Sequence, residues 1–145
     1  MIAVPDAGGQ FSTWNNQEQF TYRGRSLELH YQTEPPHGDF IYSLSLSLDG
    51  ANYRLPLWVY GRSLFFFGTS CLLAESVPVG RISELKSVVI ELSRPRYALL
   101  DSWYHQPRMT DQGLLLTRFH GGAPLLLTRA AALVWENFEI EEACL

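Results

Sequence analysis

One stretch near the middle of the chain constrains the fold more than any other. Over Phe40 to Leu48, apolar side chains at every second position alternate mainly with serines, the period-two pattern of a strand with one buried face. Asp49-Gly50 then supplies the two positive-φ positions of a tight hairpin turn. The pattern predicts a β-hairpin. Its opposing pairs on the core face would be Leu46 with Tyr53, Leu44 with Leu55, Tyr42 with Leu57 and Phe40 with Val59.

The strand after this hairpin is expected to turn again. Gly61-Arg62 fits a second hairpin turn with glycine at its first central position. On the outer face of the resulting meander, Ile41, Trp58 and Phe65 would lie side by side. An apolar cluster of that size is either covered by another element or exposed and bound to a partner. We expect a covering helix, because apolar surface is more often core than interface.

Another hairpin is predicted nearer the start of the chain. Apolar and polar residues alternate over residues 17–22 and 27–31, and Arg23-Gly24-Arg25-Ser26 forms the turn between them. Five antiparallel strands are therefore expected before residue 68. Residues 1–13 show no sustained period, which predicts a loose arm ahead of a single domain over residues 14–145.

The later part of the chain gives mixed signals. Ile82–Leu85 suits a short helical turn, and Ser87–Leu92, which is rich in β-branched residues, suits a strand. For Arg96–Tyr104, periodicity does not decide between a strand and a short helix. The sequence LLLTR occurs at residues 114–118 and again at 125–129. This echo predicts the two strands of a hairpin, since a repeat architecture would need more copies.

Residues 130–142 carry the clearest helical pattern. Apolar residues recur there at i, i+3, i+4 and i+7, namely Ala131, Val134, Trp135 and Phe138. This stripe would cover the outer apolar cluster of the meander, although Glu139, Glu141 and Glu142 oppose the helix dipole. The predicted fold class is β-rich α+β. It consists of a mainly antiparallel meander of about seven or eight strands, able to curl toward a half-barrel, with the C-terminal helix packed on it.

Composition and motifs exclude several function classes. The chain is 46% hydrophobic with a formal net charge of −4, which fits a globular protein and argues against nucleic acid as a partner. Cys71 and Cys144 match no zinc spacing or disulfide framework. No apolar stretch reaches the roughly 18 residues of a membrane span, and the start of the chain lacks the basic n-region of a signal peptide. We expect a cytoplasmic protein without a metal or cofactor.

The sequence contains no recognisable catalytic motif. Its four histidines lack the close helical spacing of a local metal site. One interpretation is a triad in which Cys71 is the nucleophile, His105 or His120 the base and Asp101 the orienting acid. The leucines that follow Cys71 indicate instead a buried, inert thiol. We therefore expect a protein that is not an enzyme.

The best candidate for a binding surface is residues 101–108. This segment combines two large aromatic residues, charges and a histidine beside a proline loop, a mixture enriched at protein interfaces and pocket mouths. The alternative is that Trp103 fills the core and its neighbours form a loop. The candidate binding residues are Asp101, Trp103, Tyr104, His105 and Arg108, together with Trp58 from the meander.

Three functions are compatible with these features. The first is a non-catalytic protein-binding module, such as a small acidic inhibitor or immunity protein that neutralises a bacterial toxin or effector. The second is a small-molecule pocket protein or small enzyme with its site near Trp58, Trp103 and His105. The third is a self-associating structural or phage assembly protein that uses its sheet edges or aromatic patch. The sequence fixes neither the partner nor the oligomeric state.

Overall fold

The computed structural model describes residues 1–128 and 132–141, and these residues form fourteen strands and no helix. The expected α+β class is therefore wrong, and the fold is a β-sheet fold. The strands are β1 (Ile2–Val4), β2 (Gly9–Phe11), β3 (Gln17–Tyr22), β4 (Arg25–Thr33), β5 (Ile41–Leu48), β6 (Ala51–Phe67), β7 (Cys71–Val77), β8 (Lys86–Glu91), β9 (Arg96–Leu99), β10 (Tyr104–Thr110), β11 (Gly113–Arg118), β12 (Leu125–Leu127), β13 (Glu136–Asn137) and β14 (Glu139–Ile140).

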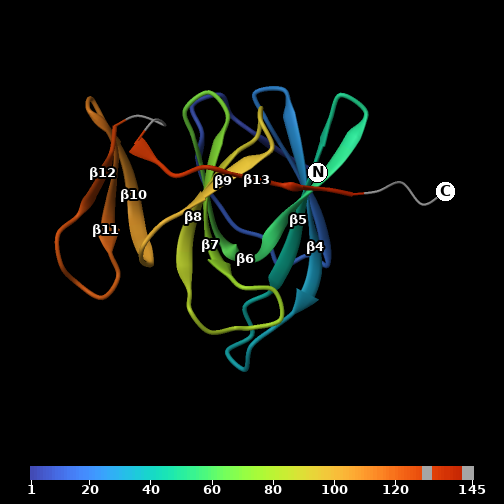
Figure 1. The fold of residues 1–145 in the computed structure, drawn as a ribbon, viewed down its shortest axis with the longest axis horizontal. Helices are drawn as coiled ribbons and strands as arrows, with labels where there is room; N and C mark the ends of the chain where they lie inside the picture. Colours follow the sequence, from blue (N-terminus) through green and yellow to red (C-terminus); the bar gives the residue numbers. More distant parts are fainter. Residues whose placement is uncertain (129–131, 142–145) are drawn as a thin grey trace.

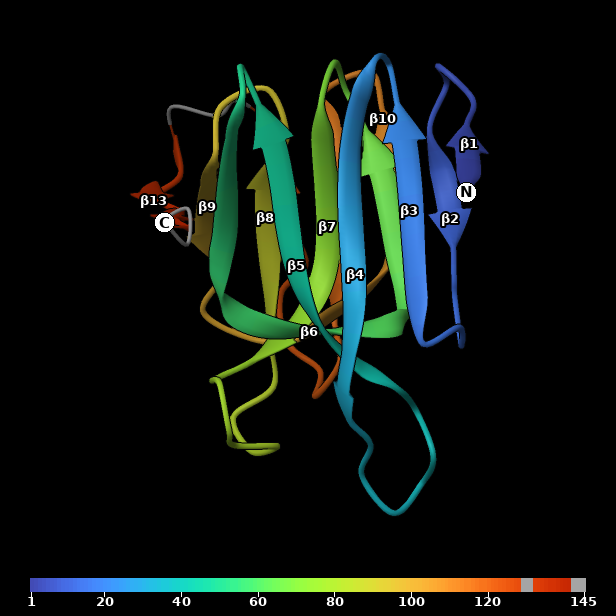
Figure 2. The same cartoon turned by 90° about the vertical axis from the view of Figure 1, so that its right-hand side faces the viewer.

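The long strand β6 organises the main sheet. Its first half pairs with β5 and its second half with β7, and the register with β7 shifts between Val59 and Leu64. Figure 2 shows β6 sweeping across one end of the molecule, so that the sheet folds over on itself. The first layer contains β3, β4, β5 and the first half of β6. The second layer contains the second half of β6 with β7, β8 and β9.

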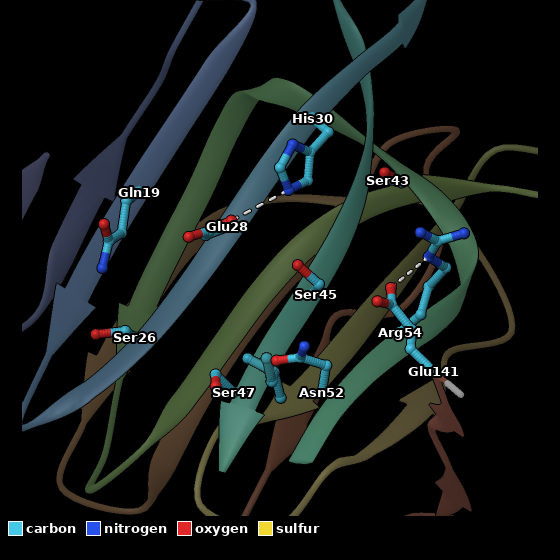
Figure 3. A pocket seen from close by; sticks show the side chains of 11 residues that line it. Gln19, Ser26, Glu28, His30, Ser43, Ser45, Ser47, Asn52, Arg54 and Glu141 are labelled. Carbon is cyan, nitrogen blue, oxygen red and sulfur yellow. Dashed lines mark ion pairs between the residues drawn. The ribbon is translucent and has the colours of Figure 1, made fainter. Parts of the chain in front are cut away.

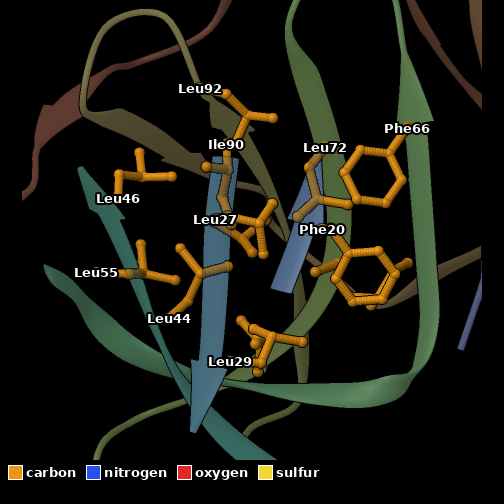
Figure 4. Close-up of a cluster of buried hydrophobic side chains, with 14 of the residues drawn as sticks. Phe20, Leu27, Leu29, Leu44, Leu46, Leu55, Phe66, Leu72, Ile90 and Leu92 are labelled. Atoms are coloured by element: carbon orange, nitrogen blue, oxygen red, sulfur yellow. The ribbon is translucent and has the colours of Figure 1, made fainter. Parts of the chain in front are cut away.

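The core lies between these two layers. Alternate side chains of both layers point inward, as the period-two pattern requires. Phe20, Leu44 and Leu55 from the first layer meet Phe66 and other apolar residues of the second, all of them fully buried. Figure 4 shows that these side chains fill the space enclosed by the curled sheet. The interior is therefore packed core and not a ligand cavity.

Both terminal segments bridge the two layers. β1 pairs in parallel with β3 in the first layer, and β2 pairs with the second half of β6. At the other side, β13 pairs with β9 in the second layer and β14 with the first half of β6. Residues 1–13 therefore do not form a loose arm. These short strands satisfy backbone groups that the sheet edges would otherwise expose.

A three-stranded sheet, β10-β11-β12, forms a third layer against the outer face of the second (Figure 1). Its inward residues, such as Leu114 and Leu116, pack with Leu73 and Val89 of the second layer. The LLLTR echo is confirmed as a hairpin, because Leu114 pairs with Leu127 and Leu116 with Leu125. Arg129, the last residue of the second copy, lies outside the described residues.

The first predicted turn is confirmed, but the predicted pairing of β5 with β6 is correct only near that turn. Asp49 and Gly50 both have positive φ, and Leu46 pairs with Tyr53. Further along, the register shifts between Ser43 and Ser45, so that Tyr42 faces Val59 instead of Leu57. Pro56 lies in the unpaired stretch of β6. A proline cannot donate to the ladder, which accounts for an irregularity at this point.

The second predicted turn, Gly61-Arg62, is wrong. Gly61 lies inside β6 and does not have positive φ, which that turn would require. A Cβ at Gly61 would come within 2.5 Å of the Tyr42 ring and 2.8 Å of the Thr13 carbonyl oxygen. Glycine is needed here because other chain segments approach the backbone closely. The chain turns instead after Phe67, at Gly68.

The outer apolar cluster is divided between two places. Ile41 and Trp58 pack with Tyr60, Val77 and Leu85. Phe65, beyond the irregularity in β6, packs instead under the three-stranded sheet. No helix from residues 1–128 or 132–141 covers either group. Residues 82–85, expected to form a helical turn, have no regular structure, although Leu85 covers part of the first group.

The predicted C-terminal helix is also wrong over its described part, residues 132–141; residues 130, 131 and 142 lie outside it. Phe138 is 6% exposed and Val134 is 83% exposed, whereas one helical stripe would bury both. The segment is extended because the edges of β9 and β6 offer it hydrogen-bond partners. Aromatic and β-branched residues also favour a strand here, and the acidic residues weaken a helix at this end.

Candidate functional site

Arg62 stands where β6 bends, and it joins three separate segments. Its Nε and Nη2 donate to the two carboxylate oxygens of Glu75 on β7, at 2.9 and 3.1 Å. Its Nη1 donates to Asp39 Oδ2 in the loop before β5, at 2.8 Å. Burial lowers the pKa of the guanidinium, but the hydrogen bonds to both carboxylates more than offset this and raise the pKa above its ordinary value. Arg62 is thus a permanent charge with fixed partners.

Aromatic rings surround this ion-pair group. The guanidinium carbon of Arg62 lies 4.2 Å from the centroid of the Tyr60 ring and 5.5 Å from that of Trp103. His37 stacks on Tyr60 at 6.1 Å and places its Nδ1 3.0 Å from Asp39 Oδ2. Cation–π contacts of this kind stabilise a partly desolvated arginine. They also bring Trp103, which precedes β10, to the bend of the main sheet.

Trp103 and Phe119 form the exposed end of the cluster. They extend the β10–β11 ladder, because the Phe119 amide donates to the Trp103 carbonyl at 2.9 Å. Their rings stack with centroids 3.6 Å apart and planes 17° apart. His105 and His120 meet the Phe119 ring edge to face, at 5.3 and 5.2 Å. Phe119 is 45% exposed despite these contacts. We call these four residues the aromatic surface.

The six residues predicted as a site lie in four different places. Trp103 and His105 belong to the aromatic surface. Tyr104 is buried, and its hydroxyl donates to Asp101 Oδ1 at 2.7 Å, so these two residues anchor the start of β10. Arg108 is exposed further along β10, beyond a register shift. Trp58 lies apart, in the group around Ile41.

Sequence reasoning missed four of the main contributors: Asp39, Arg62, Glu75 and Phe119. The sequence pattern places Arg62 in a turn, and it does not predict the pairing of β11 with β10 that brings Phe119 opposite Trp103. The positions of Trp103 and Phe119 relative to the two strands could have identified them as a pair. Once residues 104 and 118 are opposed in a hairpin, Trp103 and Phe119 must also face each other on the side of His105.

Cys71 has the environment of an inert thiol. It borders an apolar cleft of about 180 Å³ with Phe67, Val89 and Leu133. Burial, together with the nearby Glu91 carboxylate, raises the pKa of the thiol to about 11. The other proposed triad members make different contacts, because Asp101 bonds to Tyr104 and both histidines contact Phe119. Cys144 lies outside the described residues.

Residues 1–128 and 132–141 lack two further kinds of feature. In this part of the chain, no three His, Cys, Asp or Glu side chains are grouped so that they could hold a metal ion. Nor does this part contain a helix with the length and apolar character that crossing a membrane requires.

Comparisons of the chain with protein families, with curated proteins and with solved structures found no match. Support for a function therefore comes from the geometry of the aromatic surface and of the hollows on the molecule. The crevice bordering His105 has a volume of only about 10 Å³. The hollow bordering Trp58, about 490 Å³, shares no lining residue with it.

Proposed function

We propose that the chain is a protein-binding module that contacts its partner through the aromatic surface. The observation that supports this is the half-exposed Phe119 ring, stacked on Trp103 and flanked by two histidines. Interface hot spots are typically aromatic and arginine residues in well-packed surroundings. Covering the exposed part of one phenylalanine contributes on the order of 1 kcal/mol to binding.

The support behind the aromatic surface favours binding over a purely structural role. The Trp103 ring contacts the guanidinium of Arg62, and hydrogen bonds to Glu75 and Asp39 fix that guanidinium in place. A surface fixed in this way loses little conformational entropy when a partner covers it. It therefore suits recognition of a complementary protein surface without rearrangement.

The net charge of −4 favours a basic partner, because opposite net charges accelerate encounter. A specific form of the proposal is an inhibitor or immunity protein that holds a bacterial toxin or effector in the cytoplasm. A self-associating assembly protein is the competing proposal. It is less favoured, because the terminal strands β1, β2, β13 and β14 pair with the sheet edges that self-association would use.

The test is a pull-down from the native host followed by binding measurements with the purified partner. Phe119→Ala should weaken binding about thirtyfold, the effect of a 2 kcal/mol hot spot. Leu126→Ala is the matched control, since Leu126 is 36% exposed on the same small sheet and should change the Kd less than about threefold. Equal binding by Phe119→Ala and wild type would contradict the proposal, as would recovery of only a second copy of the chain.

A further inference from the structure

The outer face of the first layer carries a polar trough. Its floor is formed by three serines at alternate positions of β5, Ser43, Ser45 and Ser47. Longer side chains from β4 stand on one side, and Arg54 from β6 stands on the other with Glu141 (Figure 3). The hollow has a volume of about 360 Å³, and small-ligand sites typically measure about 300–1,000 Å³.

The backbone beneath the trough is already paired. β5 is bonded to β4 on one side and to β6 on the other. A bound chain therefore cannot add to the sheet as another strand, which is the usual way in which sheets hold peptides. A ligand here meets only side chains, so it must bring hydrogen-bonding groups of its own.

The side chains of the trough are polar without a strong excess of charge. Glu28 Oε2 lies 3.2 Å from His30 Nε2, and Arg54 Nε lies 2.9 Å from Glu141 Oε1. Each carboxylate thus has a basic neighbour within the trough. The side chains of Ser45, Ser47 and Asn52 make no hydrogen bond to residues 1–128 or 132–141. These groups can both donate and accept, which matches an uncharged ligand that carries hydroxyl groups.

A second hollow, lined by polar and apolar side chains together, continues from one end of the trough. The hollow of about 490 Å³ shares Ser43 and Arg54 with it and borders Trp58 and Val79. A tryptophan beside a row of hydroxyl and amide groups offers a flat apolar face next to hydrogen-bonding groups. Sugar rings are complementary to such a surface, because their C–H faces are apolar and the hydroxyl groups at their edges form hydrogen bonds. Alternate residues on one strand span about 13 Å from Ser43 to Ser47, which suits a short chain of sugars.

We propose that this trough binds a neutral oligosaccharide through Ser45, Asn52 and Arg54, with Trp58 as the apolar contact. The site is independent of the aromatic surface. The trough faces away from the three-stranded sheet, which lies on the opposite side of the molecule (Figure 1). The two sites can therefore be disabled separately.

The test uses the full chain and three purified probes, cellohexaose, maltohexaose and chitohexaose, followed by NMR amide shifts. At least one probe should bind with a Kd of about 1 mM or tighter and shift residues of β4, β5 and β6. Ser45→Tyr, which fills the floor, should weaken binding at least about tenfold. Asn52→Ala removes one polar group from an exposed position and should weaken it about threefold to tenfold. Phe119→Ala should leave it unchanged.

Three results would overturn the proposal. The first is no amide shift with any probe at about 5 mM, well above the expected Kd. The second is binding that Ser45→Tyr leaves intact in a folded protein, as judged by unchanged shifts in the core. The third is loss of the protein partner, but not of a sugar, in Ser45→Tyr, which would assign the trough to a protein.

Discussion

The carboxylate of Glu75, only 9% exposed, receives both of its hydrogen bonds from the guanidinium of Arg62. Replacing Arg62 by alanine leaves this carboxylate buried without its counter-charge. We expect Arg62→Ala to lower the free energy of unfolding by about 2–4 kcal/mol in urea denaturation, because an unpaired buried charge costs more than the pair contributes. Arg25→Ala, at the exposed first position of β4, should change it by less than about 0.5 kcal/mol.

A double replacement at Arg62 and Glu75 distinguishes the contribution of the ion pair to stability from that of side-chain packing. Arg62→Met with Glu75→Leu removes both charges and should cost less than Arg62→Ala alone, because no unpaired charge stays behind at Glu75. A double variant that is less stable than the single one would show that packing and the contact with Asp39 matter more than the ion pair.

Gly61 is predicted to be intolerant of any side chain. Gly61→Ala should destabilise the fold by about 2–3 kcal/mol, because its Cβ would overlap the Tyr42 ring and the Thr13 carbonyl. Gly24→Ala is the comparison, since nothing lies within 4 Å of its Cβ and only its φ of 80° opposes alanine. That variant should cost about 1 kcal/mol. Thermal or urea unfolding of both proteins distinguishes close approach from backbone strain.

The extended conformation of the C-terminal segment predicts unequal stability losses for two variants, whereas a helix with both residues buried would predict similar ones. Phe138→Ala should cost about 3–4 kcal/mol, because its ring is 6% exposed in the main core beside Tyr97. Val134→Ala should cost less than about 0.5 kcal/mol, since Val134 is 83% exposed. Similar losses of stability in the two variants would contradict the extended conformation and support a helix with one buried stripe.

The thiol of Cys71 should make the protein less stable in alkali. Because its pKa is raised to about 11 in the folded state, the unfolded chain releases this proton first. The stabilising contribution is complete below a pH of about 9 and is lost as the pH rises through about 11. In a Cys144→Ser background, stability measured between pH 8 and 11 should fall more steeply with Cys71 present than with Cys71→Ser. Equal slopes would contradict the pKa shift.

How far the sequence predicted the fold depended on local chemistry. The turn at Asp49-Gly50 was predicted correctly, because this geometry is encoded in two adjacent residues. The turn expected over residues 23–26 is shorter than predicted, since Arg25 and Ser26 already belong to β4 and only Arg23-Gly24 has positive φ. The role predicted for Gly61 was wrong. Both a turn and a close approach by other segments require glycine, and here the cause is the approach of Thr13 and Tyr42. Distance along the chain hides such contacts.

The C-terminal helix failed for a related reason. Spacings of three and four residues place Val134, Trp135 and Phe138 on one helical face. In the extended segment, Trp135 and Phe138 contact two different cores and Val134 is exposed. The segment is extended because the edges of β9 and β6, which are far away in sequence, offer it hydrogen-bond partners.

The sequence predicted only part of the candidate site. Trp103 and His105 were identified from composition, whereas Arg62 and Phe119 reach them only through tertiary structure.

The bridging terminal strands have a consequence for how the chain is made. The first half of β6, at residues 53–54, receives its neighbour β14 only when residues 139–140 have been synthesised. Until then the growing chain presents unpaired edges at β6 and β9, which are templates for association with other chains. Fragments that stop before residue 136 should therefore precipitate during expression, whereas a chain that includes residues 136–141 covers both edges.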